Sequence, residues 1–308
     1  MIHVRNLRVD YDEVCAVRDL CLEVGPGEIY GLIGPNGAGK TSTLRALVGL
    51  VEATYGDVII GGFDLDHQRE QAVGLVGFMP DSAPIYEDLT VWEFLDLFAA
   101  AYGLPPHRRG PVIDQHLQLV DLTEKRGSLT SQLSRGMRQR LMLAKTLLPD
   151  PRVLLLDEPA SGVDPNGRAL LKQILRDLGQ AGKTVIISSH ILSELSEFCT
   201  SVGVMQKGEM VVSGTVADVA ARVMGRARVA LEVVGDPEAA ATVLAADPRV
   251  SAPVWENGAC RFAFEGEGEE ASELLAALVT AGVRVASFSR EKEDLEALFL
   301  KIGAKEVS

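Results

Sequence analysis

The chain has 308 residues, of which 47% are hydrophobic and 24% are charged; these are globular values that suit two domains. Its formal net charge is −13 and no basic stretch stands out, so we expect no nucleic-acid partner. The four cysteines form no C-x-x-C pair, so we expect no disulfide framework or zinc site. No apolar run resembles a signal peptide or approaches the length of about twenty residues that spans a membrane, so we expect no direct membrane insertion.

The N-terminal part of the chain predicts strands around one helix. Residues 1–24 alternate apolar and polar side chains in short runs, which is typical of strands, with a turn near Tyr11–Glu13. The segment EIYGLIG predicts a short buried strand that ends in a glycine-rich loop, and the following KTSTLRALVGL has helical spacing. DVIIGG then predicts another strand.

A helical region follows, from about residue 86 to 150. We expect prolines 105, 106 and 111 to break it, with further helices over 113–121 and 134–148. Its first helix has one apolar face, with residues at i, i+3, i+4 and i+7: Val91, Phe94, Leu95 and Phe98.

Beyond residue 150, apolar runs alternate with helical spacing. VLLLD, TVIISS and VGVMQKG predict strands, and RALLKQILRDLGQAG predicts a helix between the first two. Short apolar strands separated by helices indicate a parallel sheet covered on both faces. The segment 214–226 predicts a helix and a linker.

After this linker the pattern changes. The order of elements, βαββαβα, predicts a small ferredoxin-like α+β domain. It carries no catalytic constellation, so a regulatory or dimer-forming domain and a stabilising appendage are both open. The expected strands cover 228–234, 249–256, 259–265 and 283–289, the helices cover 237–247, 269–282 and 293–303, and Asn257–Gly258 is a hairpin turn.

A phosphate-binding loop is predicted after the first buried strand. Residues 34–41 read GPNGAGKT, which fits G-x-x-x-x-G-K-[ST] in full. In this motif the glycines let the backbone N–H groups wrap a phosphate, and the helix that follows points its positive end at the same phosphate. The lysine of the motif reaches the β- and γ-phosphates, and its final hydroxyl binds Mg²⁺. The candidate ATP-binding residues are Gly34, Pro35, Asn36, Gly37, Ala38, Gly39, Lys40, Thr41 and Ser42.

A pair of acidic residues ends the strand RVLLLDEP at 152–159. In a parallel sheet this strand end lies at the same edge as the phosphate loop. We expect Asp157, with Thr41, to hold Mg²⁺, and Glu158 to orient and deprotonate the attacking water. On its own, an Asp-Glu pair after an apolar run is also typical of a solvent-facing strand end.

Over roughly residues 1–220, the chain resembles the ATP-binding cassette (ABC) ATPases. The most specific element is LSRGMRQRL at 133–141, which resembles the LSGGQ signature that binds the γ-phosphate held by the other protomer of a cassette dimer. Leu133, Ser134 and Gly136 match the signature, whereas Arg135 and Met137 depart from it. A hydroxyl, a glycine and a helix N-terminus aimed at an anion are retained, although Ser134 also fits a plain helix N-cap.

Three more pieces match this family in order. SGVD at 161–164 resembles the D-loop, which implies that Asp164 contacts the partner's site. His190, after TVIISS, resembles the switch histidine that contacts the γ-phosphate. Tyr11 resembles the aromatic residue that stacks on adenine, although a tyrosine in a strand turn is often only packing.

Asp81 is a departure from the family pattern. It stands after a strand where the family usually has a glutamine. The carboxylate could reach Mg²⁺ or the attacking water in a catalytic or metal-binding role, but it adds negative charge beside the γ-phosphate. A turn residue before Ser82 and Pro84 is the alternative.

The resemblance implies an α/β P-loop NTPase core with an antiparallel β-subdomain and a helical subdomain. We expect the nucleotide-binding domain at 1–222, with its helical subdomain at about 84–150, and an accessory domain at 226–308. The implied function is an ATPase that uses ATP and Mg²⁺ and powers export through a separate membrane permease. We expect it to form a cassette dimer, specifically a homodimer, and to act at the cytoplasmic side of the plasma membrane. A soluble cassette ATPase acting in translation or repair and a nucleotide-sensing regulator are the alternatives.

Overall fold

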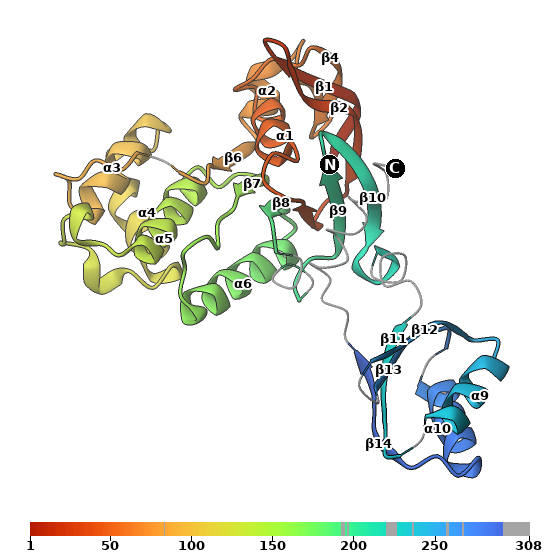
Figure 1. Cartoon of the computed structure of the whole chain (residues 1–308). Coiled ribbons are helices and arrows are strands. Elements are labelled where there is room, and N and C mark those ends of the chain that lie inside the picture. Colours follow the sequence, from red (N-terminus) through yellow and green to blue (C-terminus); the bar gives the residue numbers. More distant parts are fainter. Residues whose placement is uncertain are drawn as a thin grey trace. The chain divides into compact units, whose positions relative to one another are not determined.

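The computed structural model describes residues 1–82, 84–191, 195, 197–219, 227–235, 237–256, 259–266 and 268–291. Contacts between Cα atoms divide the chain into two units, Met1–Val219 and Ala220–Ser308 (Figure 1). The linker that the sequence predicts ends in residues 220–226, which lie outside the described residues.

The first unit is built on a six-stranded sheet with the order β10-β9-β3-β8-β7-β6. All its strands are parallel except β10, which pairs antiparallel with β9. Strands β3, β7 and β8 are buried along their whole length, which explains their continuous apolar runs. The strands are β3 (Ile29–Ile33), β6 (Val76–Met79), β7 (Val153–Asp157), β8 (Thr184–Ser189), β9 (Ser201–Gln206) and β10 (Glu209–Thr215).

A second, antiparallel sheet of the first unit has the order β2-β1-β4-β5. Its strands are β1 (Ile2–Tyr11), β2 (Val14–Val24), β4 (Tyr55–Ile60) and β5 (Phe63–Asp64). One hydrophobic core joins it to the parallel sheet through α1 (Lys40–Leu47), because Val4 of β1, Leu44 of α1 and Leu155 of β7 belong to the same buried cluster. The short helix α2 (Arg69–Val73) follows β5.

The helical part contains α3 (Val91–Ala101), α4 (Pro106–Leu119) and α5 (Arg135–Leu147), followed after β7 by α6 (Pro165–Gln180). The predicted break at Pro105 and Pro106 is confirmed, because α3 ends at Ala101 and α4 begins at Pro106, whereas the predicted break at Pro111 is wrong. Pro106 is the first residue of α4, where its missing N–H has no intrahelical partner to lose, and Pro111 lies inside the helix. The helix therefore starts earlier than the predicted 113–121.

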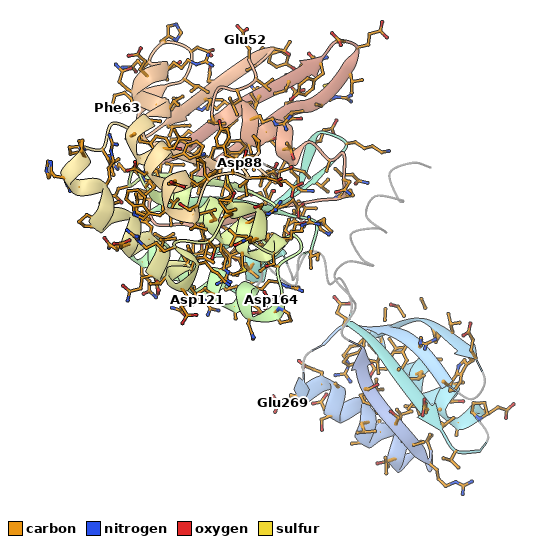
Figure 2. The ribbon with its side chains drawn as sticks, turned by 90° about the vertical axis from the view of Figure 1, so that its left-hand side faces the viewer. Glu52, Phe63, Asp88, Asp121, Asp164 and Glu269 are labelled. Atoms are coloured by element: carbon orange, nitrogen blue, oxygen red, sulfur yellow. The ribbon has the colours of Figure 1, made fainter. Side chains whose placement is uncertain are left out.

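The second unit has the antiparallel sheet order β12-β13-β11-β14 with α9 and α10 in the connections. This is the predicted ferredoxin-like plan, and the inward-facing residues of β11 and β13 share one core with both helices. The elements are β11 (Ala227–Val233), α9 (Glu238–Ala246), β12 (Val250–Glu256), β13 (Ala259–Phe264), α10 (Gly268–Thr280), where Figure 2 labels Glu269, and β14 (Val285–Glu291). The hairpin turn at 257–258 and the final helix at 293–303 lie outside the described residues.

A second stretch also differs from its prediction. The sequence predicts a helix and linker over 214–226, but β10 continues to Thr215, and helical residues begin only at 216. In the described part of the chain, every helix is too short or too polar to cross a membrane.

Candidate functional site

The carboxyl ends of four parallel strands meet at one edge of the large sheet. Ile33 of β3 is paired with Ser189 of β8, and Asp157 of β7 is paired with Ser188. On the other side of β7, Met79 of β6 is paired with Leu156. This register brings the glycine-rich loop, the Asp-Glu pair, His190 and the loop that carries Asp81 to the same edge, as the sequence predicts.

The glycine-rich loop connects β3 to α1. Gly39 precedes the helix with a φ of 101°, and a Cβ atom at this position would lie 2.5 Å from the carbonyl oxygen of Ala16. Only glycine fits both conditions. Gly34 is equally confined, because its Cβ atom would collide with the carbonyl oxygen of Met205.

The remaining residues of the loop turn back on themselves. The N–H of Ala38 donates to the carbonyl oxygen of Pro35 at 3.1 Å. Pro35, Asn36 and Gly37 are exposed at the tip, and Ser42 is half-buried in the first turn of α1. The tip of the loop is therefore exposed, whereas the side chain of its charged residue, Lys40, is buried.

The ammonium group of Lys40 is buried within the loop. The side chain is only 5% exposed, and its Nζ donates to the carbonyl oxygens of Gly34 at 2.7 Å and Pro35 at 3.3 Å. It also forms an ion pair with the carboxylate of Glu158, with Nζ and Oε1 3.5 Å apart. The ammonium group is therefore fixed at the sheet edge between the loop carbonyls and a carboxylate.

The Asp157 carboxylate connects α1, which follows the phosphate loop, to strand β8. Its Oδ2 accepts from the hydroxyl of Thr41 at 2.8 Å, and its Oδ1 accepts from the hydroxyl of Ser188 at 2.6 Å. The side chain is 1% exposed, so these donors hold it in one orientation. A carboxylate and a hydroxyl beside a phosphate loop are the oxygen ligands that Mg²⁺ prefers.

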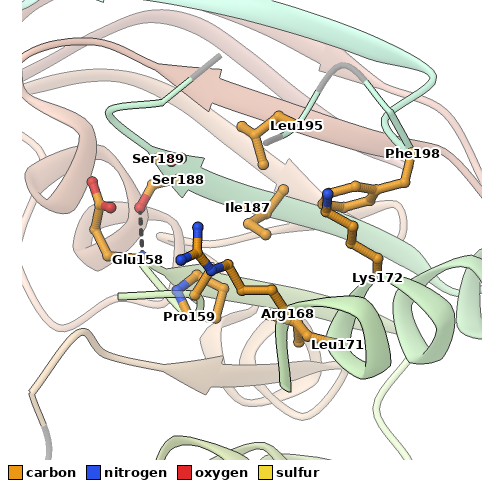
Figure 3. Close-up of a pocket in the computed structure, with 11 residues that line it drawn as sticks. Glu158, Pro159, Arg168, Leu171, Lys172, Ile187, Ser188, Ser189, Leu195 and Phe198 are labelled. Carbon is orange, nitrogen blue, oxygen red and sulfur yellow. Dashed lines mark hydrogen bonds between the residues drawn. The ribbon is translucent and has the colours of Figure 1, made fainter. Parts of the chain in front are cut away.

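Glu158 follows in a strained turn, with a φ of 47°. Its N–H donates to Ser188 Oγ at 2.9 Å, the dashed line in Figure 3, and its carboxylate lies 2.9 Å from Nδ1 of His190. Glu158 also lines a small, largely apolar cavity between α6 and β8, beside Arg168, Leu171 and Ile187 (Figure 3). The carboxylate thus faces a histidine on one side and Lys40 on the other.

The residues of the signature segment begin α5. Ser134 is the N-cap, and its hydroxyl accepts from the N–H of Met137 at 3.3 Å. Gly136 is buried, and Nη2 of Arg135 donates to the hydroxyl of Ser161 at 2.9 Å. Asp164 is the N-cap residue of α6 without a side-chain cap bond. Among the described residues, no hydrogen bond or ion pair joins this group to the phosphate loop of the same chain.

Asp81 and Tyr11 lie at the margins of the site. The carbonyl oxygen of Asp81 accepts from Nε2 of the buried Gln139 at 3.2 Å. Its carboxylate is exposed and has no hydrogen-bond or ion-pair partner in the part of the chain that the structure describes. Tyr11 is 38% exposed at the end of the β1–β2 hairpin, whose Ala16 contacts Gly39.

Sequence reasoning missed three residues that hold the site together. Ser188 bonds both Asp157 and Glu158, Gln139 holds the Asp81 loop, and Ser161 holds Arg135. Ser188 could have been found, because it stands two residues before His190 at a strand end. Gln139 and Ser161 lie inside the segments LSRGMRQRL and SGVD, but nothing in those segments predicts these two hydrogen bonds.

Comparisons with known proteins agree with this geometry. A family model described as ABC transporter matches residues 17–161. An ABC transporter ATP-binding protein of Synechocystis sp. is 34% identical over 295 residues, which are 94% of this chain and 78% of that protein. The linearmycin resistance ATP-binding protein LnrL of Bacillus subtilis is 28% identical and is matched over 98% of each chain. The Nod factor export ATP-binding protein I of Burkholderia pseudomallei is 36% identical over 69% of this chain and 70% of that protein.

The fold is found in solved structures as well. The ATP-binding subunit of an ABC transporter superposes with a TM-score of 0.66 and 29% identity, over 72% of this chain and 92% of that one. The dimeric cassette MJ0796 bound to ADP and Pi superposes with a TM-score of 0.65 and 23% identity, over 70% and 99% of the two chains. The chain therefore belongs to the ABC transporter family and is one of its ATP-binding, ATP-hydrolysing subunits.

Proposed function

We propose that this chain powers an exporter, with Glu158 as the general base and the phosphate loop as the ATP site. The observation that carries this proposal is the convergence of Lys40, Asp157, Glu158 and His190 at one sheet edge. Lys40 neutralises the β- and γ-phosphates, and the loop N–H groups wrap them. Glu158 accepts the proton of the attacking water, while His190 orients Glu158 and contacts the γ-phosphate.

Mg²⁺ fits the donor set beside the loop. Thr41 and Asp157 place a hydroxyl and a carboxylate oxygen 2.8 Å apart, and Ser188 fixes the other carboxylate oxygen. These two side chains would hold the ion, and Asp81 is the nearby candidate for a third contact. When bound, the ion supplies positive charge to the phosphates. Tyr11 is proposed to stack on the adenine ring.

The working unit is proposed to be a cassette homodimer. Each ATP is bound by Gly34–Thr41 of one copy and by Ser134–Gly136 of the other, with Asp164 near the partner's site. Ser134 and Arg135 are exposed, and among the described residues neither is hydrogen-bonded to the phosphate loop of its own chain, which supports this arrangement. Closure on ATP and reopening after hydrolysis then follow from contacts that exist only while the γ-phosphate is present.

Export through a separate membrane permease is supported by what the relatives are named for. One is named for linearmycin resistance and another for Nod factor export. The chain is proposed to act at the cytoplasmic face of the plasma membrane, with the helical part at about 84–150 transmitting motion to the permease. The division into a nucleotide-binding domain at 1–222 and an accessory domain at 226–308 remains our proposal, with the accessory domain regulating or pairing the subunits.

Co-purification tests the transporter assignment. The tagged full chain, expressed in its own host and extracted in mild detergent, should retain a polytopic membrane protein that stimulates phosphate release. The inactive Lys40→Ala variant, folded and equally abundant, should retain the same membrane protein without turnover. Recovery of ribosomes or DNA instead of a membrane protein would favour a soluble cassette ATPase. Absence of phosphate release even with the permease present would favour a nucleotide sensor.

A further inference from the structure

The hydroxyl of Ser188 is hydrogen-bonded to both residues of the Asp-Glu pair. Ser188 is fully buried near the carboxyl end of β8. Its Oγ donates to Oδ1 of Asp157 at 2.6 Å and accepts from the N–H of Glu158 at 2.9 Å (Figure 3). A serine hydroxyl has one hydrogen to donate, so the bond from Glu158 leaves that hydrogen for Asp157. One small side chain therefore holds two consecutive acidic residues of the neighbouring strand end.

The carboxylate of Asp157 is held by a hydroxyl on each oxygen. Oδ1 accepts from Ser188, and Oδ2 accepts from Thr41 of α1 at 2.8 Å. The side chain of Asp157 is 1% exposed, so water has little access to replace a lost donor. The bond from Ser188 thus fixes the rotation of the carboxylate and keeps Oδ2 toward Thr41.

The main chain of Glu158 depends on the same hydroxyl. Its φ of 47° lies in the left-handed region, which is costly for a residue with a side chain and persists only where neighbouring groups hold it. Ser188 holds the N–H of Glu158, and the carbonyl oxygen accepts from the N–H of Ser161 at 3.0 Å. This turn directs the Glu158 carboxylate to Lys40 and His190. Removing the Ser188 hydroxyl would remove one of the bonds that hold the turn.

We propose that Ser188 is a positioning residue of the ATPase reaction. Its hydroxyl fixes the Asp157 carboxylate for Mg²⁺ and the Glu158 carboxylate for the attacking water at the same time. The chain of hydrogen bonds from Thr41 through Asp157 and Ser188 to Glu158 is continuous, with lengths of 2.8, 2.6 and 2.9 Å. The inference rests on the proposed roles of Asp157 and Glu158, and it assigns Ser188 no contact with the nucleotide.

Thr184 is a matched control at the opposite end of β8. It is 1% exposed, and its hydroxyl also makes two bonds, donating to the carbonyl oxygen of Gly25 at 3.0 Å and accepting from the N–H of Gly27 at 3.2 Å. Thr184→Val keeps the shape of the side chain and removes both bonds. Ser188→Ala and Thr184→Val should both lower the melting temperature, because each leaves buried polar groups unpaired. Only Ser188→Ala should change Mg²⁺ binding and turnover.

Binding of Mg²⁺ is measured without turnover. The full-length chain is unfolded thermally with ADP at increasing Mg²⁺, which gives the Mg²⁺ concentration for half of the maximal stabilisation. Ser188→Ala should raise this concentration at least about tenfold, the usual effect of removing a hydrogen-bond partner from a metal-binding carboxylate. Thr184→Val should match the native chain. A native chain whose stabilisation by ADP does not respond to Mg²⁺ contradicts the proposed Mg²⁺ site itself. A responsive native chain with an unaffected Ser188→Ala variant overturns the role of Ser188.

Phosphate release at saturating Mg²⁺ tests the effect on Glu158. Ser188→Ala should lower kcat about 10- to 100-fold, as expected for a misplaced reacting group. KM for ATP should stay unchanged, because Lys40 and the phosphate loop are intact. Ser188→Thr restores a hydroxyl and should recover most of the turnover. Three results overturn the proposal: a loss in KM rather than in kcat, equal turnover of Ser188→Ala and Thr184→Val, or Ser188→Thr as slow as Ser188→Ala.

Discussion

The carboxylate of Glu158 lies between a buried lysine and a histidine, with contacts of 3.5 Å and 2.9 Å. Replacing Glu158 with glutamine keeps the size of the side chain but removes the proton acceptor. We expect phosphate release to fall by at least about 100-fold, as is typical for loss of a general base, while ATP binding persists. Steady-state phosphate release and binding of a fluorescent ATP analogue measure the two effects.

The matched control for this change is Glu52→Gln. Glu52 is an exposed glutamate of the same unit and is not one of the site residues, so its replacement should leave turnover unchanged. Normal phosphate release by the Glu158→Gln variant would show that another group activates the water.

Two glycines of the phosphate loop differ in what surrounds them. Gly37 and Gly39 both have positive φ, so alanine at either position is strained by about 1–2 kcal/mol. Only at Gly39 does the added Cβ atom also meet backbone, 2.5 Å from the oxygen of Ala16; at Gly37 no atom lies within 4 Å. Gly39→Ala should therefore weaken ATP binding much more than Gly37→Ala, as measured by nucleotide titration. Equal losses would mean that backbone strain alone matters.

At the scale of single elements, α3 begins with a capping box. Thr90 Oγ1 accepts from the N–H of Glu93 at 3.2 Å, and the Glu93 carboxylate accepts from the N–H of Thr90 at 2.8 Å. Thr90→Ala should lower the free energy of unfolding by about 1 kcal/mol. Thermal unfolding followed by circular dichroism measures it, with Thr123→Ala, an exposed threonine, as the control. An unchanged melting temperature would show that the subdomain does not depend on this cap.

The same capping box makes stability depend on pH. Hydrogen bonds from the N–H and hydroxyl of Thr90 lower the pKa of Glu93 below its ordinary 4.5. A lowered folded-state pKa stabilises the protein above the ordinary value, and this contribution is lost as the pH falls through the folded-state pKa. The stability difference between the native chain and Glu93→Gln should therefore shrink on acidification below about pH 4. Urea unfolding of both proteins at neutral and acidic pH measures this, and a difference that grows on acidification contradicts it.

The sequence predicts most of the elements because periodicity reports burial directly. The runs VLLLD and TVIISS lie in strands that are buried throughout. Helix α3 shows its predicted apolar face, with Val91, Phe94 and Leu95 fully buried. Burial of these residues can be predicted from the local sequence, since a helix that packs on one face needs apolar residues at i, i+3 and i+4, and a fully buried strand needs a continuous apolar run.

The elements that were missed depend on context. Strand β10 alternates exposed and half-buried residues and is defined by pairing with β9, which a local pattern does not reveal. Helix α4 tolerates Pro111 because Ile113 and Leu117 are buried in the helical part. In the site, motifs predicted the charged residues, whereas Ser161 and Gln139 were missed because their bonds cross between loops and a helix.

At the scale of the whole molecule, the two units have separate hydrophobic cores. Each unit also contains a buried cysteine, whose reaction with a thiol reagent can be used to follow the unfolding of that unit. Cys199 belongs to the first unit, and burial raises the pKa of its thiol to about 12. Cys260 lies in the core of the second unit, and burial raises the pKa of its thiol as well. Both thiols should be unreactive until the surrounding structure opens, because thiolate is the reactive form.

We therefore expect thiol labelling to resolve the unfolding of the two units within the full chain. In a Cys21→Ser background, which removes the exposed thiol, a maleimide is added across a urea series and the labelled sites are read by peptide mass spectrometry. Units that unfold independently give different urea midpoints for Cys199 and Cys260. Leu274→Ala, which removes a buried side chain of the second core, should shift the midpoint of Cys260 by an amount equivalent to about 2–5 kcal/mol. The midpoint of Cys199 should stay in place, and a joint shift of both would mean that the units unfold as one cooperative structure.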